Sequence, residues 1–293
     1  MPTYQSHHKP SPLSYGAIGD AYGFCFEFAS AEFVRYNNDL KFHQHPEFKV
    51  TPGFYSDDTQ MHLALGELII SGKEWTPKFI AQSFIDVFKR DPRQGYASGF
   101  HSFLKSVNSG EEFVEKIRPE SERNGAAMRA PVIGILPDIH EVKEKSRIQA
   151  MLTHDTKGGR DSAVASSLLC HYFAYGLGKK NDAPDFLEAH LPGHDWATPW
   201  VDPIPVHGII TVRAAVTAIT QTDSLSALLK KCISFTGDVD SVATIALASA
   251  SCSMEFKRDI PKNLWSDIED SKFGISYLLD LDSRILELTI NQS

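Results

Sequence analysis

The sequence predicts an all-α fold, and two observations support this class. Apolar residues recur at helical spacing wherever a pattern is clear, whereas the two-residue alternation of strands is hard to find. Thr76 and Pro77 are typical of a helix start, because the hydroxyl can cap and proline suits the first turn. An apolar stripe follows them at Phe79, Ile80, Phe84, Ile85 and Phe88. Ser224 is expected to cap a similar helix over 225–235.

Further helices are expected over 147–152, 162–177, 209–220, 242–254 and 274–288. The run over 242–254 carries small or apolar residues on several faces, which is typical of a helix at the centre of a bundle. Three stretches, 37–55, 108–123 and 192–206, are expected to be irregular. The last is rich in proline and tryptophan, and we expect a lid or a partner surface there. We predict a single domain over 1–293, in which residues 1–12 are flexible.

Composition limits the classes of function. The chain has 293 residues and a net charge of −8, and no Lys/Arg block compensates for that charge. We therefore expect neither a nucleic-acid partner nor a membrane partner. The four cysteines are widely spaced and lack a CxxC motif, which favours reduced core thiols. The first twenty residues do not resemble a secretion signal, so we expect a cytoplasmic protein. We also expect a monomer, because the sequence has no obvious surplus apolar stripe.

Two acidic clusters precede apolar helical runs. The first is Ser56-Asp57-Asp58-Thr59-Gln60, and the second is Gly237-Asp238-Val239-Asp240-Ser241. Each aspartate could simply cap its helix, which for one cluster alone is the better interpretation. However, each cluster combines two carboxylates with a hydroxyl, and Mg²⁺ and Mn²⁺ prefer such oxygen ligands. If the two helix starts converge, four carboxylates need cations to coexist.

Other stretches carry candidate ligand contacts. Asp20 and Glu27 are seven residues apart, which would place them on one face of a continuous helix. The glycine-rich stretch 94–99 could direct backbone N–H groups at phosphate oxygens. Residues 124–129 place small side chains between polar ones, which suits either a close ligand or a tight helix contact. His154 is a ligand contact or an ordinary polar residue at a helix end.

In order along the chain, these motifs resemble those of the ADP-ribosylglycohydrolase family. The motifs are Gly19-Asp20-Ala21-Tyr22-Gly23 with Glu27, residues 56–60, Gly95-Tyr96 with Gly99, residues 124–129, Thr153-His154, and residues 237–241. The resemblance spans residues 16 to about 254. It implies an all-α orthogonal bundle that holds two Mg²⁺ or Mn²⁺ ions in a cleft.

The resemblance also implies roles for individual residues. The metal ligands would be Ser56, Asp57, Asp58, Asp238, Asp240 and Ser241. Asp57 would bridge the metals and Asp58 would be the catalytic base, with Glu27 as the alternative base. The substrate contacts would be Gly95, Tyr96, Ser98 and Gly99 at the diphosphate, and Asn124, Gly125, Met128 and His154 around the ribose or adenosine.

The sequence departs from the family pattern at three places. Arg123 stands where a glycine often precedes Asn124, so the adenosine end of the pocket is expected to differ in shape. The segment after His154 lacks a proline that is common there. Ser56 and Ser241 replace frequent threonines and keep the hydroxyl. The residues of the metal site therefore match the family pattern, whereas those of the substrate pocket depart further from it.

The implied reaction is hydrolysis of the bond between C1 of ADP-ribose and a modified protein side chain, with arginine as the favoured linkage. The expected partners are the ADP-ribosylated protein, ADP-ribose and a cognate ADP-ribosyltransferase. Two alternatives remain. One is a two-metal hydrolase of phosphoesters, against which the lack of histidine and basic clusters counts. The other is a binding or immunity protein of the same fold that blocks a transferase toxin.

Overall fold

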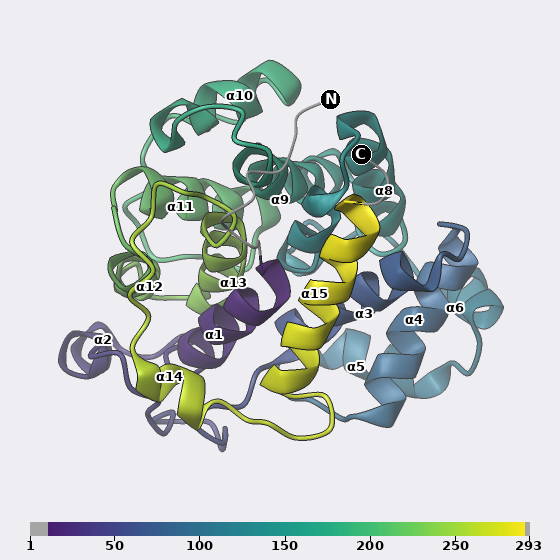
Figure 1. Ribbon diagram of the computed structural model, residues 1–293. Helices are drawn as coiled ribbons and strands as arrows, with labels where there is room; N and C mark the ends of the chain where they lie inside the picture. Colours follow the sequence, from purple (N-terminus) through teal and green to yellow (C-terminus); the bar gives the residue numbers. More distant parts are fainter. Residues whose placement is uncertain (1–10, 291–293) are drawn as a thin grey trace.

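The computed structural model describes residues 11–290 and is built from α-helices, without a strand in that range (Figure 1). The prediction of an all-α class is confirmed. The helices are α1 (Pro12–Phe24), α2 (Ala31–Asn37), α3 (Asp57–Ser71), α4 (Pro77–Arg90), α5 (Ser98–Ser106), α6 (Gly110–Lys116), α7 (Gly125–Met128), η1 (Pro131–Ile135), α8 (Ile139–Met151), α9 (Lys157–Ala174), η2 (Lys180–Asp182), α10 (Ala183–His190), α11 (Gly208–Thr220), α12 (Leu225–Ser234), α13 (Val239–Ala250), α14 (Lys262–Asp267) and α15 (Ile275–Ile290).

Helices α1 and α13 form the most extensive helix pair and lie at the centre of the bundle (Figure 1). Every residue of α13 is buried, as expected for a helix that is small or apolar all round. Two glycines of α1 allow the close approach. A Cβ at Gly19 would lie 2.4 Å from the Ala243 carbonyl oxygen, and one at Gly23 would lie 2.4 Å from Asp240 Cα. The α1–α13 contact therefore fixes the backbone beside one acidic cluster.

The start of α1 is capped from the other end of the chain. Ser11 occupies the N-cap position without a side-chain cap bond. Asp282 on α15 instead accepts hydrogen bonds from the backbone N–H of Leu13 at 3.0 Å and of Ser14 at 2.9 Å. A carboxylate is favourable at this position because the first N–H groups of a helix carry partial positive charge. The expected flexibility of residues 1–12 falls mainly on 1–10, outside the described residues, whereas Pro12 already belongs to α1.

The helix caps were predicted more reliably than the helix lengths. Thr76 caps α4 and Ser224 caps α12, as predicted. The helix expected over 147–152 is longer, since α8 begins at Ile139, and the one expected to reach 254 ends at Ala250. The expectation of an irregular stretch over 108–123 was wrong in part, because α6 lies within it. Ser109 caps α6 by accepting from the Glu112 N–H.

The long loop 192–206 is irregular, as predicted, and is anchored to the bundle. Trp196 is only 1% exposed, and its indole N–H donates to the Leu191 carbonyl. Near its end, the Ile204 N–H donates to the Thr236 carbonyl, and the Asp238 N–H donates to the Ile204 carbonyl. The loop therefore supports the backbone of the second acidic cluster. Among the described residues, no helix is both long and apolar enough to cross a bilayer.

Candidate active site

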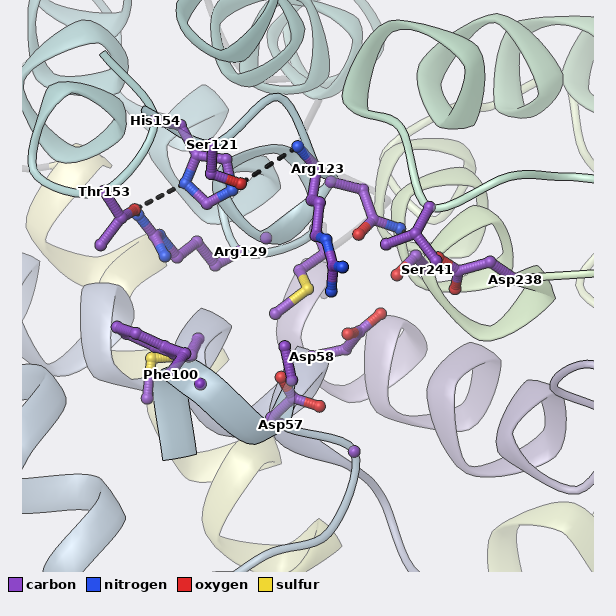
Figure 2. Close-up of a pocket in the computed structure, with 18 of the residues that line it drawn as sticks. Asp57, Asp58, Phe100, Ser121, Arg123, Arg129, Thr153, His154, Asp238 and Ser241 are labelled. Carbon is purple, nitrogen blue, oxygen red and sulfur yellow. Dashed lines mark hydrogen bonds between the residues drawn. The ribbon is translucent and has the colours of Figure 1, made fainter. Parts of the chain in front are cut away.

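A pocket of about 540 Å³ brings the two acidic clusters together. Its acidic wall carries five carboxylates and one hydroxyl: Glu27, Asp57, Asp58, Asp238, Asp240 and Ser241. Its other walls carry basic side chains, namely Lys116, Arg118, Arg123 and Arg129, and apolar ones that include Phe28, Met61, Phe100, Phe103 and Met128. The pocket is therefore lined by both acidic groups and cations, and Figure 2 shows Arg123 and Arg129 across from Asp57 and Asp58.

The first acidic cluster sits on the first turn of α3. Neither aspartate is needed as the cap, because the hydroxyl of Ser56 accepts from the Asp58 N–H at 3.2 Å. The Asp57 N–H donates to the Gln94 carbonyl at 2.9 Å. Both carboxylates are thus left to face the pocket. Ser56, predicted as a metal ligand, is fully buried and lies beneath this turn as its cap.

Asp20 anchors this turn from α1. Its Oδ2 accepts from the backbone N–H of Ser56 and of Thr59, both at 2.9 Å, and from the Thr59 hydroxyl at 2.6 Å. Sequence reasoning noted Asp20 but assigned it no such role. The expectation that Asp20 and Glu27 share one helical face was wrong, because α1 ends at Phe24 and Glu27 lies in the following turn.

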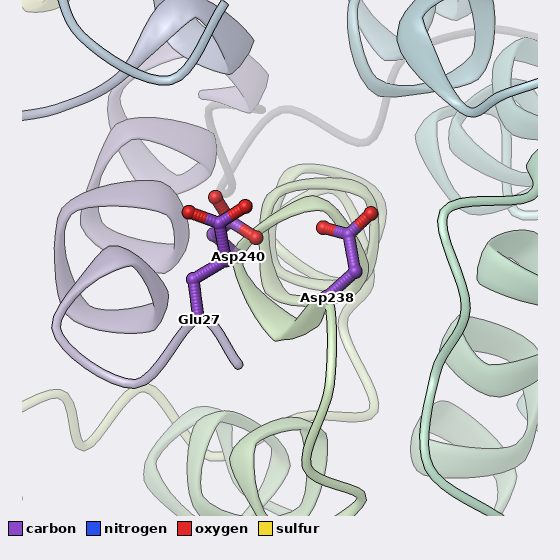
Figure 3. A group of neighbouring side chains, drawn as sticks. All are labelled: Glu27, Asp238 and Asp240. Carbon is purple, nitrogen blue, oxygen red and sulfur yellow. The ribbon is translucent and has the colours of Figure 1, made fainter. Parts of the chain in front are cut away.

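The second acidic cluster begins α13. Oxygens of Glu27, Asp238 and Asp240 all lie within 4.8 Å of one another (Figure 3). Asp238 is at the N-cap position but makes no side-chain cap bond. Its Oδ2 accepts instead from the Asn124 amide at 2.8 Å. Asn124, predicted as a substrate contact, is thus placed to orient a carboxylate. Glu27, predicted only as a base, joins the tightest carboxylate group.

These carboxylates strongly perturb one another. Burial, together with the charges of Asp238 and Asp20, raises the pKa of Glu27 to about 8. Burial also raises the pKa of Asp57 and Asp58 well above the usual range, and Asp20 adds to both effects. The pKa of Asp240 rises in the same way through burial, Glu27 and Asp238. Such shifts are typical of functional sites, where like charges are held together.

The acidic wall suits hard divalent cations. Asp58 Oδ2 and Asp240 Oδ1 are buried and have no hydrogen-bond partner among the described residues. Buried, unpaired carboxylate oxygens are costly unless a proton or a cation satisfies them. The donor set is made only of carboxylates and a hydroxyl, which is the chemistry that Mg²⁺ and Mn²⁺ prefer. The residues present therefore fit such ions.

The glycine-rich stretch lies directly against the first acidic cluster. Gly95 has φ +99°, and a Cβ there would lie 2.1 Å from Asp57 Oδ1. Gly95 and Gly99 line the pocket. Tyr96 and Ser98, also predicted as substrate contacts, are not among the described residues that line it; the Tyr96 hydroxyl donates to Gln60 at 2.7 Å.

The remaining predicted contacts, Gly125, Met128 and His154, all line the pocket. Figure 2 shows His154 on the side away from Asp57 and Asp58. Arg123 also reaches the pocket, and its charge lowers the pKa of both Asp238 and His154, in each case as a smaller effect than burial. The residue that departs from the family pattern therefore contributes a cation to the pocket. Sequence reasoning noted Arg129 only within its motif and did not anticipate that it would line the pocket.

Fold and pocket define an all-α protein with a carboxylate-rich cleft. The chain matches the ADP-ribosylglycohydrolase family over residues 16–292, and it belongs to that family. A solved structure described as an ADP-ribosylglycohydrolase-related protein complex has the same fold, with a TM-score of 0.70. It is 19% identical, and the match covers 95% of this chain and 96% of that one.

Relatives that carry the name ADP-ribosylhydrolase ARH3 are similar to part of the chain. The Xenopus tropicalis protein is 31% identical over 133 residues, which is 42% of this chain and 37% of that protein. The Mus musculus protein is 28% identical over 149 residues, 48% of this chain and 39% of that protein. The Homo sapiens protein is 28% identical over 149 residues, which is 48% of this chain and 40% of that protein. The matches therefore span well under half the length of these relatives.

Proposed function

We propose that the protein is a metal-dependent ADP-ribosylhydrolase that removes ADP-ribose from modified protein side chains. The observation that carries the proposal is the convergence of five carboxylates, from α3, α13 and the turn after α1, on a pocket with cations on its other walls. A substrate with a diphosphate and a sugar fits such a pocket, because cations attract the phosphates while carboxylates bind metals and sugar hydroxyls.

Asp57, Asp58, Asp238 and Asp240 would hold two Mg²⁺ or Mn²⁺ ions, with Ser241 and Ser56 as hydroxyl ligands and Glu27 beside them. When bound, such ions lower the pKa of water and orient oxygen ligands. Two residues orient these carboxylates through hydrogen bonds. Asn124 donates to the Asp238 carboxylate, and Asp20 accepts from the turn that carries Asp57 and Asp58.

The reaction transfers a hydroxyl from water to C1 of the ribose and a proton to the leaving side chain. Asp58 is the candidate base that takes the proton from water, and Glu27 is the alternative. The transition state of glycoside cleavage carries positive charge at C1, which nearby carboxylates stabilise.

The test incubates the protein and Mg²⁺ or Mn²⁺ with proteins ADP-ribosylated on arginine, serine or threonine, and measures free ADP-ribose. We expect release that chelation abolishes, and the arginine linkage is our preferred substrate. Asp58→Ala and Asp240→Ala should abolish turnover in a folded protein, whereas Asp280→Ala, an exposed carboxylate on α15, should not. Full activity in either of the first two variants would contradict the proposal.

The same assay separates the alternatives. Cleavage of phosphoesters without ADP-ribose release would favour a phosphoester hydrolase. Tight binding of an ADP-ribosyltransferase without any turnover would favour an immunity protein.

A further inference from the structure

A buried hydrogen-bond chain leads from α8 to the pocket. Arg129 donates through Nε to Gln149 Oε1 at 2.6 Å, and through one terminal nitrogen to the Gln149 carbonyl at 3.0 Å and to Thr153 Oγ1 at 2.8 Å. Thr153 Oγ1 lies 2.6 Å from Nδ1 of His154 (Figure 2). Arg129 is 1% exposed, Thr153 6% and His154 7%, so water does not compete with these contacts.

Donor counting fixes the proton on His154. A guanidinium can only donate, so Thr153 Oγ1 accepts from Arg129. The single hydroxyl hydrogen of Thr153 is then free to donate, and its neighbour within reach is His154 Nδ1. If Nδ1 carried the proton, the Thr153 hydrogen would have no acceptor in a buried site, which is costly. Nδ1 is therefore the acceptor, and the proton of the neutral ring is on Nε2.

The ring stays neutral. Burial, together with the charges of Arg129 and Arg123, lowers the pKa of His154 to about 3. Arg129 remains a cation at neutral pH, although burial lowers its pKa to about 9. The Phe84 ring supports the cation, with the guanidinium carbon 4.6 Å from its centroid.

His154 lines the pocket, and its Nε2 is buried and has no hydrogen-bond partner among the described residues. The absence of a side chain at Gly125 keeps the space beside it open, since a Cβ there would lie 3.4 Å from Nε2. On the other side, a Cβ at Gly159 would lie 2.7 Å from His154 Cβ, so the ring is held close to α9. A buried N–H without a partner is a place for a ligand acceptor.

We propose that Arg129 and Thr153 are positioning residues that fix His154 as a neutral Nε2–H donor, so that this end of the pocket selects ligands with an acceptor atom there. This inference rests on the proposed function for the identity of the ligand: the acceptor is a ring nitrogen, hydroxyl or phosphate oxygen of the nucleotide part of ADP-ribose. The opposite, acidic side then receives the distal ribose. A ligand that presents a donor to His154 is disfavoured because two donors would meet.

The tautomer is read by long-range ¹H–¹⁵N NMR of the histidine rings, with His154→Gln used to assign the signal. We expect the Nε2–H form in the wild type and in Thr153→Ser, and a mixture of tautomers in Thr153→Val. Calorimetric titration with ADP-ribose should show a dissociation constant that rises for Thr153→Val in inverse proportion to its Nε2–H fraction, about twofold for an equal mixture, and an unchanged value for Thr153→Ser. The matched control is Thr220→Val, whose hydroxyl bonds only carbonyls of α11.

A wild-type protein with the Nδ1–H form would overturn the inference, and so would Thr153→Val with unchanged tautomer and affinity. The tautomer is measured without ligand or turnover. A wild-type protein with the Nε2–H form that does not bind ADP-ribose would therefore overturn the proposed function and the ligand assignment together, while the hydrogen-bond chain itself would stand.

Discussion

Asp20 and Thr59 share two hydrogen bonds, because Oδ2 of Asp20 accepts both the backbone N–H of Thr59 at 2.9 Å and its hydroxyl at 2.6 Å. The same oxygen also accepts from the Ser56 N–H. One buried carboxylate on α1 therefore organises the first turn of α3, which carries Asp57 and Asp58.

Replacing Asp20 should separate its acceptor role from its charge. Asp20→Ala leaves three buried donors without an acceptor, and we expect it to lower the free energy of unfolding by about 3 kcal/mol or more, at about 1 kcal/mol or more for each donor. Asp20→Asn keeps one oxygen that can accept these bonds, so its loss should be smaller. Urea denaturation measures both. Equal losses in the two variants would contradict the acceptor role.

Gly95 should not tolerate a side chain. Gly95→Ala places a methyl group 2.1 Å from Asp57 Oδ1 and keeps a positive φ that alanine disfavours. We expect a loss of about 1–3 kcal/mol in stability from the backbone alone and a fall in turnover of about 100-fold from the displaced carboxylate. Thermal unfolding and the ADP-ribose release assay measure the two effects.

Gly99→Ala is the matched control for stability. Gly99 lies in α5, and a Cβ there meets nothing within 4 Å. Alanine favours a helix over glycine by about 1 kcal/mol, so this variant should be as stable as the wild type or more stable. A destabilised Gly99→Ala variant and a stable Gly95→Ala variant would reverse the expected order.

Asn124 is expected to act through Asp238. Asn124→Ala removes the amide that donates to Asp238 Oδ2 at 2.8 Å. Groups that orient metal ligands typically contribute about 10- to 100-fold to metal affinity or activity. Titration with Mn²⁺ should show a loss of that size. Asn108→Ala, an exposed residue whose side chain contacts Lys89, should leave the affinity unchanged.

Without divalent cations, the free energy of unfolding should fall as pH rises from about pH 4.5, the pKa of an unfolded glutamate, to about pH 8. Burial raises the pKa of Glu27 to about 8, so the folded protein keeps a proton that the unfolded chain has already lost. The stability from that proton is present at low pH and is lost as pH rises through the folded pKa. For one such group, the free energy of unfolding changes by up to about 1.4 kcal/mol per pH unit.

Two buried histidines do not obscure this effect. Burial lowers the pKa of His62 and of His154 to about 3, and an unfolded histidine is also neutral above about pH 7. The slope between about pH 7 and about pH 8 therefore has no contribution from them. Bound Mg²⁺ should flatten the slope, because the cation replaces the proton. Chemical denaturation over this pH range, once with EDTA and once with Mg²⁺, measures how the free energy of unfolding changes with pH. Equal slopes under the two conditions would contradict a cation at this site.

Local rules in the sequence accounted for much of the fold. The N-caps at Thr76 and Ser224 and the apolar stripes behind them depend on residues a few positions apart, so a single sequence is enough to find them. Helix α6 was missed because it is short, and its Ser109 cap precedes only one buried aromatic, Phe113. Short helices gain most of their stability from packing, which a local pattern does not show.

The residues of the acidic wall were also predicted from the sequence, since paired carboxylates at two helix starts are visible locally. Three contacts were not. Asp20 meets Thr59 over 39 positions, Asn124 meets Asp238 over 114, and Arg129 meets Thr153 over 24. Each depends on how helices pack, and the close α1–α13 contact at Gly19 and Gly23 is part of that packing.

By itself, the sequence determined the all-α class, the main helix starts and the oxygen-rich chemistry of the two clusters. Only the tertiary structure decided that Glu27 joins Asp238 and Asp240, and that Nδ1 of His154 meets a Thr153 hydroxyl held by Arg129. The physical reason is that ligand type and helical period are properties of neighbouring residues. Carboxylate proximity, pKa and tautomer instead depend on burial and on partners that packing brings from elsewhere in the chain.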